Sequence, residues 1–411
     1  MKVVLFPPTG ARVTPEERRA KRPIGRDVAT YQNTLQELEW LAIAADERGI
    51  DNIGVTEHHF HTEGNESIPN SLMFFAKLAA KTRRITFMPL SIVLPSHDPL
   101  RAAEDIALFD NMFPGRVAVS FARGYVTRWM QTLTQKERIG ASPIDREADE
   151  RNREIFNEYL DVVIKAWTQD TFNHNGKHYQ APYPATGIHH WPPAQWTREY
   201  GADGEVDAEG TIHKIGVIPK PVTQPYPQIW TPIPMSHRSL IEAARRRFIA
   251  VVYEARPDVF RKWCEDYRDA AVKAGHRARL GQGIAAMRKM FLADSFEEAF
   301  ESAVKTAGYW FNNYFSQWGV NETLRLPTDD PKKWVTFSSD RECAQRMIDA
   351  GQFLCGTPDD VSRQLESLHR CHADGELEWL VWEWWVAPDD SRDDQLRRMD
   401  MFVNKIWPRF K

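Results

Sequence analysis

The 411-residue sequence lacks several features that would narrow its function at once. Its four cysteines, Cys264, Cys343, Cys355 and Cys371, form no C-x-x-C pair, which argues against a zinc site and for a reducing compartment. The formal net charge is only -4, so nothing electrostatic favours nucleic acid or an anionic membrane as a partner. No apolar run is long enough to span a bilayer or, at the amino terminus, to serve as a signal peptide. These absences predict a cytoplasmic protein.

Two catalytic fingerprints are also missing. No G-x-G-x-x-G follows an expected strand, so a nicotinamide-binding Rossmann unit is not supported. No G-x-S-x-G is present, so a serine hydrolase with a nucleophile elbow is not supported. Aromatic residues, by contrast, are abundant: 15 Trp and 21 Phe predict a sizeable core or an aromatic pocket.

Apolar runs without alternation recur between amphipathic helices, a pattern typical of parallel strands buried on both faces. About eight strand–helix units can be counted, the number that closes a (β/α)8 barrel. The sequence therefore predicts an α/β protein with a single TIM barrel over residues 1–411. Strands are expected at 2–6, 50–56, 85–94, 116–121, 228–232, 248–253, 285–293 and 377–386. Helices are expected at 31–48, 70–81, 100–112, 151–168, 236–247, 256–274, 295–315, 358–371 and 393–407.

Other segments show neither the apolar stripe of an amphipathic helix nor the continuous apolar run of a buried strand. Residues 9–27 are polar and punctuated by proline and glycine, so we expect a loop there, followed by a helix that Thr30 caps. A short hairpin is expected at 173–180. Residues 181–226 and 317–339 are long enough to be insertions or lids at the C-terminal face of the barrel.

The apolar run 50–56 ends in Glu57, His58, His59 and Phe60. Catalytic residues of parallel barrels follow the carboxyl ends of strands, so these histidines occupy a position suited to chemistry. Adjacent residues of a strand point to opposite faces, so His58 and His59 cannot both bind one ion, and no metal site is expected. A histidine here is more often a packed residue than a catalyst, but histidine also suits general acid–base work near neutral pH.

Three further segments carry residues that could bind a ligand. Arg123 follows an expected strand, where its guanidinium could grip a phosphate or pair with an acid. Ser236 and Ser239 lie at an expected helix start, where hydroxyl and backbone N–H groups bind anions, although Ser236 could equally be an ordinary cap. Tyr125 and Trp129 are candidate walls of an apolar substrate pocket.

The Glu57-His58-His59-Phe60 motif, the block from Ile92 to Asp105 and Arg123 after its strand together resemble the bacterial luciferase family of flavin-dependent monooxygenases. The resemblance covers nearly the whole chain, with gaps at the first loop and the long insertion. It implies that reduced FMN reacts with O2 to give a flavin peroxide, which oxygenates an apolar organic substrate. It also implies a separate NAD(P)H:flavin reductase and a homodimer.

The resemblance assigns roles to residues near the flavin ring. It implies that His58 is the acid–base catalyst and that a non-proline cis peptide bond joins Leu90 and Ser91 beneath the ring.

A second group of residues would hold the phosphate. The resemblance implies Arg123 as a ligand, beside Ala122, where luciferases often have cysteine. It further implies that Met235, Ser236 and Ser239 complete the site.

Two alternatives stay open. His237 and Arg238 stand where the family often has an acid, which predicts a more basic phosphate pocket. The first alternative is therefore a deazaflavin-dependent hydride-transfer oxidoreductase of the same superfamily. The other alternative is a non-catalytic flavin-binding barrel, which would need neither His58 nor a long lid. The loops that select a substrate carry no usable pattern, so the sequence does not name one.

Overall fold

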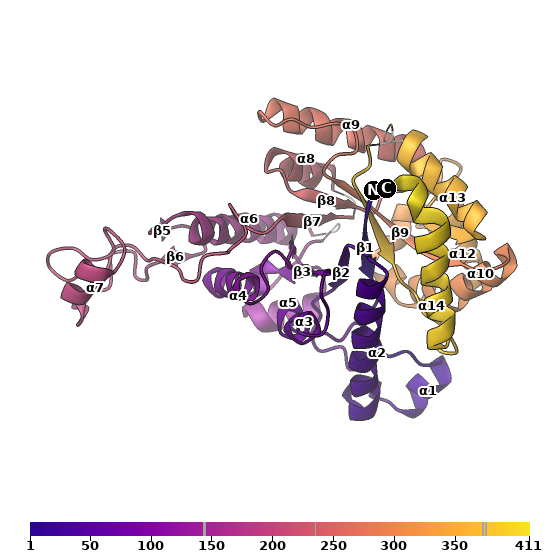
Figure 1. Ribbon diagram of the computed structural model, residues 1–411, viewed down its shortest axis with the longest axis horizontal. Coiled ribbons are helices and arrows are strands. Elements are labelled where there is room, and N and C mark those ends of the chain that lie inside the picture. Colours follow the sequence, from indigo (N-terminus) through magenta and orange to yellow (C-terminus); the bar gives the residue numbers. More distant parts are fainter. Residues whose placement is uncertain (143–144, 235, 372–373, 375) are drawn as a thin grey trace. The chain divides into compact units, whose positions relative to one another are not determined.

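The computed structural model describes residues 1–142, 145–234, 236–371, 374 and 376–411. It confirms the predicted (β/α)8 barrel (Figure 1). Around the ring the strands follow the order β9-β11-β1-β2-β3-β4-β7-β8, pairing of β8 with β9 closes it, and β10 adds to β9 from outside. The strands are β1 (Lys2–Phe6), β2 (Asn52–Val55), β3 (Thr86–Val93), β4 (Val119–Ala122), β7 (Ile229–Ile233), β8 (Ile249–Val252), β9 (Ile284–Leu292), β10 (Phe353–Gly356) and β11 (Trp379–Glu383).

Helices connect the strands, and several that the sequence did not reveal are present. None of the helices in the described residues combines the length and apolar character that a membrane crossing requires. The helices are α1 (Pro15–Ala20), α2 (Val28–Glu47), α3 (Ser71–Ala79), α4 (Pro99–Met112), α5 (Thr127–Thr134), α6 (Arg146–Thr168), α7 (Ala194–Tyr200), α8 (His237–Arg245), α9 (Pro257–Lys273), α10 (Phe296–Ala303), α11 (Tyr309–Asn313), α12 (Asp340–Asp349), α13 (Pro358–Glu366) and α14 (Arg392–Met401).

The described chain divides into two compact units. The first comprises residues 1–69, 80–88 and 229–411, and the second comprises 70–79 and 89–228.

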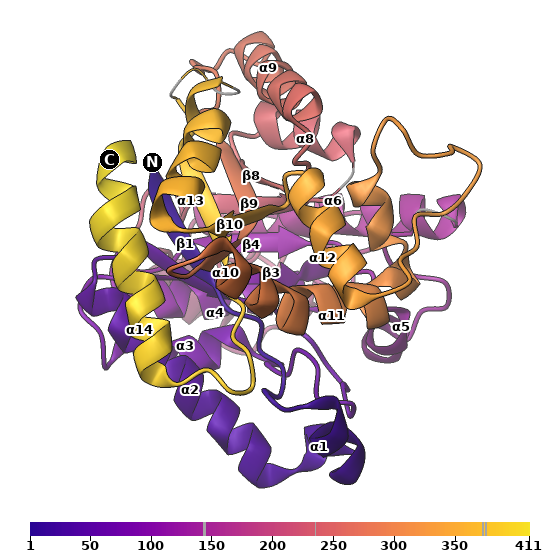
Figure 2. The same ribbon diagram turned by 90° about the vertical axis from the view of Figure 1, so that its right-hand side faces the viewer.

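In the first unit, parallel pairing sets which side chains share a row. Phe6 on β1 is level with Glu383 on β11, and Glu383 is level with Lys289 on β9. Every residue of β9 is buried, as expected for a strand covered on both faces. Figure 2 shows α10, α12 and α13 gathered around β10, where Phe291, Phe353 and their neighbours form an apolar core.

Two expectations about the amino-terminal segment were wrong. Residues 9–27 are not only loop, because α1 forms there with a capping box between Thr14 and Glu17. Helix α2 begins earlier than expected and is capped by Asp27, whose carboxylate accepts the N–H of Thr30 at 2.9 Å. Thr30 is therefore the capped residue and not the cap.

The carboxyl-terminal half also departs from expectation. The single helix expected at 295–315 is α10, a π-helical turn at Val304–Gly308, and α11. In the segment 317–339, short 3-10 helices lie at its start, at Phe315–Trp318 and Val320–Leu324.

In the second unit, α6 packs against α4, and the Trp167 indole N–H donates to the Ala103 carbonyl at 3.0 Å. The expected hairpin at 173–180 is confirmed as an antiparallel pair of β5 (His174–Asn175) and β6 (Gln180–Ala181). The segment 181–226 carries α7 and a backbone pairing of Ile188 with Ile212. Figure 1 shows the α7 segment projecting beyond α6 within this unit.

Candidate functional site

His58 lies just beyond the carboxyl end of β2 and is held by the loop that follows. Its backbone N–H donates to the Ile68 carbonyl at 3.1 Å, so the loop folds back onto the strand exit. Its Nε2 lies 3.0 Å from Oε2 of Glu66, with side-chain exposures of 7% for the histidine and 13% for the glutamate. The Thr56 hydroxyl donates to the other carboxylate oxygen of Glu66 at 3.1 Å.

The environment of Glu66 favours its ionised form. Burial alone would raise the pKa of this carboxyl, but the charge of His58 and its hydrogen bond, with smaller effects from His61 and Thr56, lower the pKa below its ordinary value. The Glu66 carboxylate and the His58 imidazole are thereby paired in a buried position beyond the carboxyl end of β2. Such a pair can hold or move a proton.

The neighbouring histidine makes a separate pair. Nε2 of His59 lies 2.9 Å from Oε1 of Glu57, and both side chains are largely buried. His58 and His59 thus contact different carboxylates, as their opposite directions predict. The His61 ring lies 5.1 Å from that of His58, and the Tyr314 ring lies 6.4 Å from that of His61.

A buried ion pair, which the sequence analysis missed, lies on adjacent strands of the same unit. Nζ of Lys289 is 2.9 Å from Oε2 of Glu383, with side-chain exposures of 2% and 9%. The indole N–H of Trp385 donates to the other oxygen of Glu383 at 3.0 Å. Burial, with the charges of Glu383 and Glu66, raises the pKa of Tyr253, so its phenol stays neutral. The sequence signal that could have revealed this pair is a charged residue within each of the apolar runs that form β9 and β11.

Arg123, in the second unit, directly follows β4 and is paired with an acid. Its Nη1 donates to Oδ1 of Asp149 at 2.8 Å, and Nη2 of Arg153 lies 3.2 Å from the other oxygen of that carboxylate. Burial and then the nearby charge of Arg153 lower the pKa of Arg123. The side chain of Arg123 is only 17% exposed, so Arg123 is paired with an acid but is not a surface residue.

The predicted cis peptide bond between Leu90 and Ser91 is confirmed. The pairing of β3 with β4 shifts register between Leu90 and Ile92, and the Ser91 and Ser120 hydroxyls lie 2.7 Å apart. Ala122 ends β4, level with Val93 on β3.

The two candidate pocket walls differ in exposure. Tyr125 is 38% exposed, whereas Trp129 is 1% exposed and belongs to the core around α5.

The predicted helix-start site is in the first unit. Ser236 caps α8 by accepting the N–H of Ser239 at 3.3 Å, and the Ser239 hydroxyl donates to that of Ser236 at 3.0 Å. The ordinary-cap interpretation of Ser236 is therefore correct, whatever else it binds. His237 pairs with Asp266 at 2.9 Å, which offsets the basic character expected of it. Met235 lies outside the described residues.

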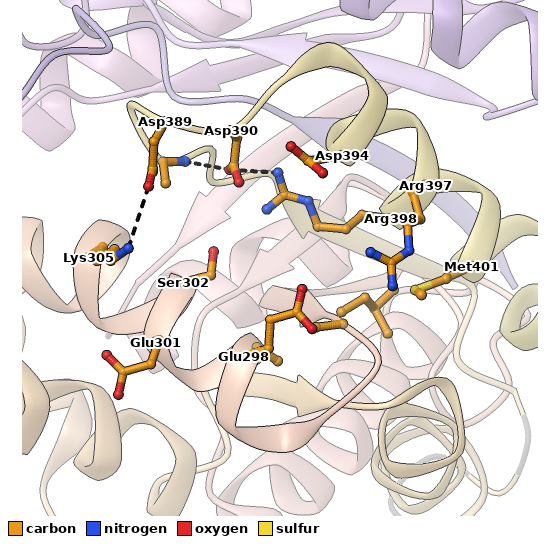
Figure 3. Close-up of a pocket in the computed structure, with 14 residues that line it drawn as sticks. Glu298, Glu301, Ser302, Lys305, Asp389, Asp390, Asp394, Arg397, Arg398 and Met401 are labelled. Atoms are coloured by element: carbon orange, nitrogen blue, oxygen red, sulfur yellow. Dashed lines mark hydrogen bonds and ion pairs between the residues drawn. The ribbon is translucent and has the colours of Figure 1, made fainter.

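A surface pocket between α10 and α14 contains none of the predicted site residues (Figure 3). Two ion pairs lie among its lining residues: Lys305 with Asp389 at 3.5 Å, and Arg398 with Asp390 at 2.6 Å. We therefore assign it no part in the site.

Comparison with known proteins agrees with the fold. The chain is 25% identical over 349 residues to 3,6-diketocamphane 1,6-monooxygenase of Pseudomonas putida, covering 82% of this chain and 84% of that protein. It is 22% identical over 393 residues to the oxygenase component of the flavin-dependent trigonelline monooxygenase of Acinetobacter baylyi, covering 93% and 92%.

The solved structure of the oxygenating constituent of 3,6-diketocamphane monooxygenase from Pseudomonas putida, a type II Baeyer-Villiger monooxygenase in complex with FMN, has the same fold. The TM-score is 0.72 at 22% identity, and the match covers 100% of this chain and 99% of that one. The sequence model of the family described as luciferase-like monooxygenase matches residues 19–375. The chain therefore belongs to the luciferase-like monooxygenase family, enzymes that incorporate oxygen from O2.

Proposed function

We propose that this chain is the oxygenase component of a two-component monooxygenase. It takes reduced FMN from a separate NAD(P)H:flavin reductase and uses O2 to oxygenate an apolar organic substrate. Family membership supports the class, and the likeness to the oxygenase component of trigonelline monooxygenase supports a separate reductase. The observation that carries the proposal is the buried His58 at a strand exit, paired with the ionised Glu66.

The chemistry of the donor set fits a flavin phosphate. Arg123 and Arg153 place two guanidinium groups beside Asp149 and Glu150, and guanidinium groups can bind a phosphate bidentately. The start of α8, with Ser236 and Ser239, offers hydroxyl and backbone N–H donors of the kind that bind anions. Our candidate phosphate ligands are Arg123 in the second unit and Ser236 and Ser239 in the first unit, with Met235 as a further candidate.

The remaining assignments concern the flavin ring and the substrate. Leu90, Ser91 and Ala122 would contact the flavin, while Tyr125 and Trp129 would bound the substrate pocket. Bound reduced FMN supplies the activation of O2. The protein's own part is to orient the substrate, exclude water, and hold a proton on His58 for the reacting oxygen.

Anaerobic titration with photoreduced FMN, followed by rapid mixing with oxygenated buffer, tests the proposal. We expect saturable binding and a transient absorbance band that differs from those of both reduced and oxidised FMN. Binding without the band would favour a non-catalytic flavin binder. Failure to bind reduced FMN, with binding of a deazaflavin, would favour the hydride-transfer alternative.

Two variants separate binding from chemistry. His58→Ala should leave the affinity for reduced FMN unchanged and divert oxygen consumption to hydrogen peroxide, so wild-type turnover would remove His58 from catalysis. Arg123→Ala should weaken FMN binding by about 1.5–3 kcal/mol, the scale of a lost charged hydrogen bond. An unchanged affinity would remove Arg123 from the phosphate site.

The homodimer is part of the proposal. Within the second unit, α3 and α4 pack together and expose Met73 (74%), Leu108 (50%) and Met112 (50%), an apolar surface that a second copy could cover. Sedimentation velocity on the purified protein would measure the assembly directly, and a monomer at micromolar concentration would contradict it.

A further inference from the structure

We propose that Glu66 is a positioning residue for His58: it keeps a proton on Nε2, and so makes Nδ1 the ring atom that gains and loses a proton in the reaction. The catalytic meaning of this inference rests on the proposed function. The tautomer itself does not, because it follows from the geometry of the pair.

The position of the carboxylate favours one tautomer. Oε2 of Glu66 lies 3.0 Å from Nε2 of His58 inside the protein, so its negative charge stabilises a proton on that nitrogen. An ionised carboxylate carries no proton of its own, so the ring proton that it favours is the one on Nε2 of His58. The pKa of Glu66 is lowered despite its burial, so the carboxylate is ionised near neutral pH.

Glu66 is itself held in place. Its Oε1 accepts from the Thr56 hydroxyl at 3.1 Å, so the carboxylate has a fixed contact on each oxygen. Thr56 precedes His58 by two residues and directly follows β2, whereas Glu66 comes from the returning loop. The strand exit and the loop therefore clamp the carboxylate at a defined distance from the imidazole.

The surrounding groups do not replace this pair. The ring of His61 is 5.1 Å from that of His58 and contributes a smaller lowering to the pKa of Glu66. Burial and the charges of Glu383 and Glu66 raise the pKa of Tyr253, so its phenol remains neutral. The charge of Glu383 is paired with that of Lys289.

The chain contains a matched control. Glu57 contacts His59 at 2.9 Å through the same atom types and at similar burial, one residue along the sequence. No role in binding or catalysis is assigned to this second pair. Removing its carboxylate should therefore disturb its own histidine and leave His58 as it was.

Nitrogen-15 NMR of the protein without flavin, labelled at the histidine rings, reads the tautomers directly. The His58 signals are identified by their loss in His58→Ala. We expect His58 in the wild type to carry its proton on Nε2, and both tautomers to be populated in Glu66→Gln and in Glu66→Ala. Glu57→Gln should alter the signals of His59 alone.

A second measurement connects the tautomer to function. With reduced FMN bound, Glu66→Gln should slow product formation about tenfold or more and raise peroxide release, while the affinity for FMN stays unchanged. Glu66→Asp, which keeps the charge, should recover part of the rate, and Glu57→Gln should match the wild type.

Two results would overturn the inference: a wild-type His58 with its proton on Nδ1, or a tautomer that is the same in the wild type and both Glu66 variants. Failure of the proposed function would look different, since His58→Ala would then turn over normally while the tautomer measurements could still succeed.

Discussion

The buried pair of Lys289 and Glu383 offers the sharpest test of the energetics inside the barrel. Lys289→Met keeps most of the side chain's length and apolar stem but removes the ammonium group, which lies 2.9 Å from the carboxylate. Glu383 is then left 9% exposed, with the Trp385 indole N–H at 3.0 Å as its remaining contact among those described.

The expected loss of stability follows from the Glu383 carboxylate, which is left buried without its cationic partner. Removing one member of a buried ion pair costs about 3–5 kcal/mol, because the partner's desolvation is no longer offset. The hydrogen bond from Trp385 to Glu383 remains in the variant, which places the loss at the lower end of this range. We therefore expect Lys289→Met to lower the free energy of unfolding by about 3 kcal/mol. The double variant Lys289→Met/Glu383→Gln should recover most of that loss, because it leaves no uncompensated charge.

Urea unfolding at pH 7, followed by tryptophan fluorescence and circular dichroism, measures these differences. Lys305→Met is the control: its pair with Asp389, drawn in Figure 3, spans 3.5 Å at side-chain exposures of 58% and 72%. Such an exposed pair contributes less than about 1 kcal/mol. The reasoning would be refuted if Lys289→Met lost no more than this control, or if the double variant were less stable than the single one.

Three further predictions follow from local geometry. Gly124→Ala should destabilise the protein by about 1–3 kcal/mol in urea unfolding, because φ is 74° and a Cβ would lie 2.5 Å from Val93 Cγ1; full stability would contradict this. Asp46→Asn should cost roughly 2 kcal/mol by the same measurement, since its carboxylate accepts three backbone N–H groups of residues 83–85 at 2.7–2.9 Å; an unchanged midpoint would disprove that role. Although burial opposes it, Arg123 lowers the pKa of Asp149, so the carboxylate's stabilisation is complete above pH of about 4 and is lost as pH falls through the lowered folded pKa. Asp149→Asn should accordingly be less stable than the wild type at pH 7 and approach it in acid, and a difference independent of pH would rule this out.

The barrel strands could be predicted because each is a continuous apolar run, which is what burial on both faces requires. Helix α12 could not be predicted in the same way. It buries only Cys343, Ala344 and Met347 against α11 and β10, and most of its remaining residues are polar. A narrow buried stripe gives little periodic signal, so tertiary contacts define this helix more than its pattern does. Helix α1 buries none of its six side chains and so shows no apolar stripe; its local signal is the capping box of Thr14 and Glu17.

The residues of the candidate site also differ in whether the sequence alone reveals them. The positions of His58 and Arg123 just after β2 and β4 could be predicted, because a strand exit is a local property of the sequence. Their partners could not. Glu66 arrives through a loop that turns back, and Lys289 meets Glu383 only because two distant strands are neighbours in register. The cis bond at Leu90–Ser91 was found by resemblance alone, since no local pattern requires it.

The strand exit itself explains how one short motif builds two unlike pairs. Residues two apart in extended chain point to the same side, which lets Glu57 reach His59 and brings the Thr56 hydroxyl to the side of His58. His58, pointing the other way from Glu57, needs a carboxylate from elsewhere, and the loop supplies Glu66. The order acid, histidine, histidine therefore does more than mark the family, because it decides which imidazole Glu66 can hold.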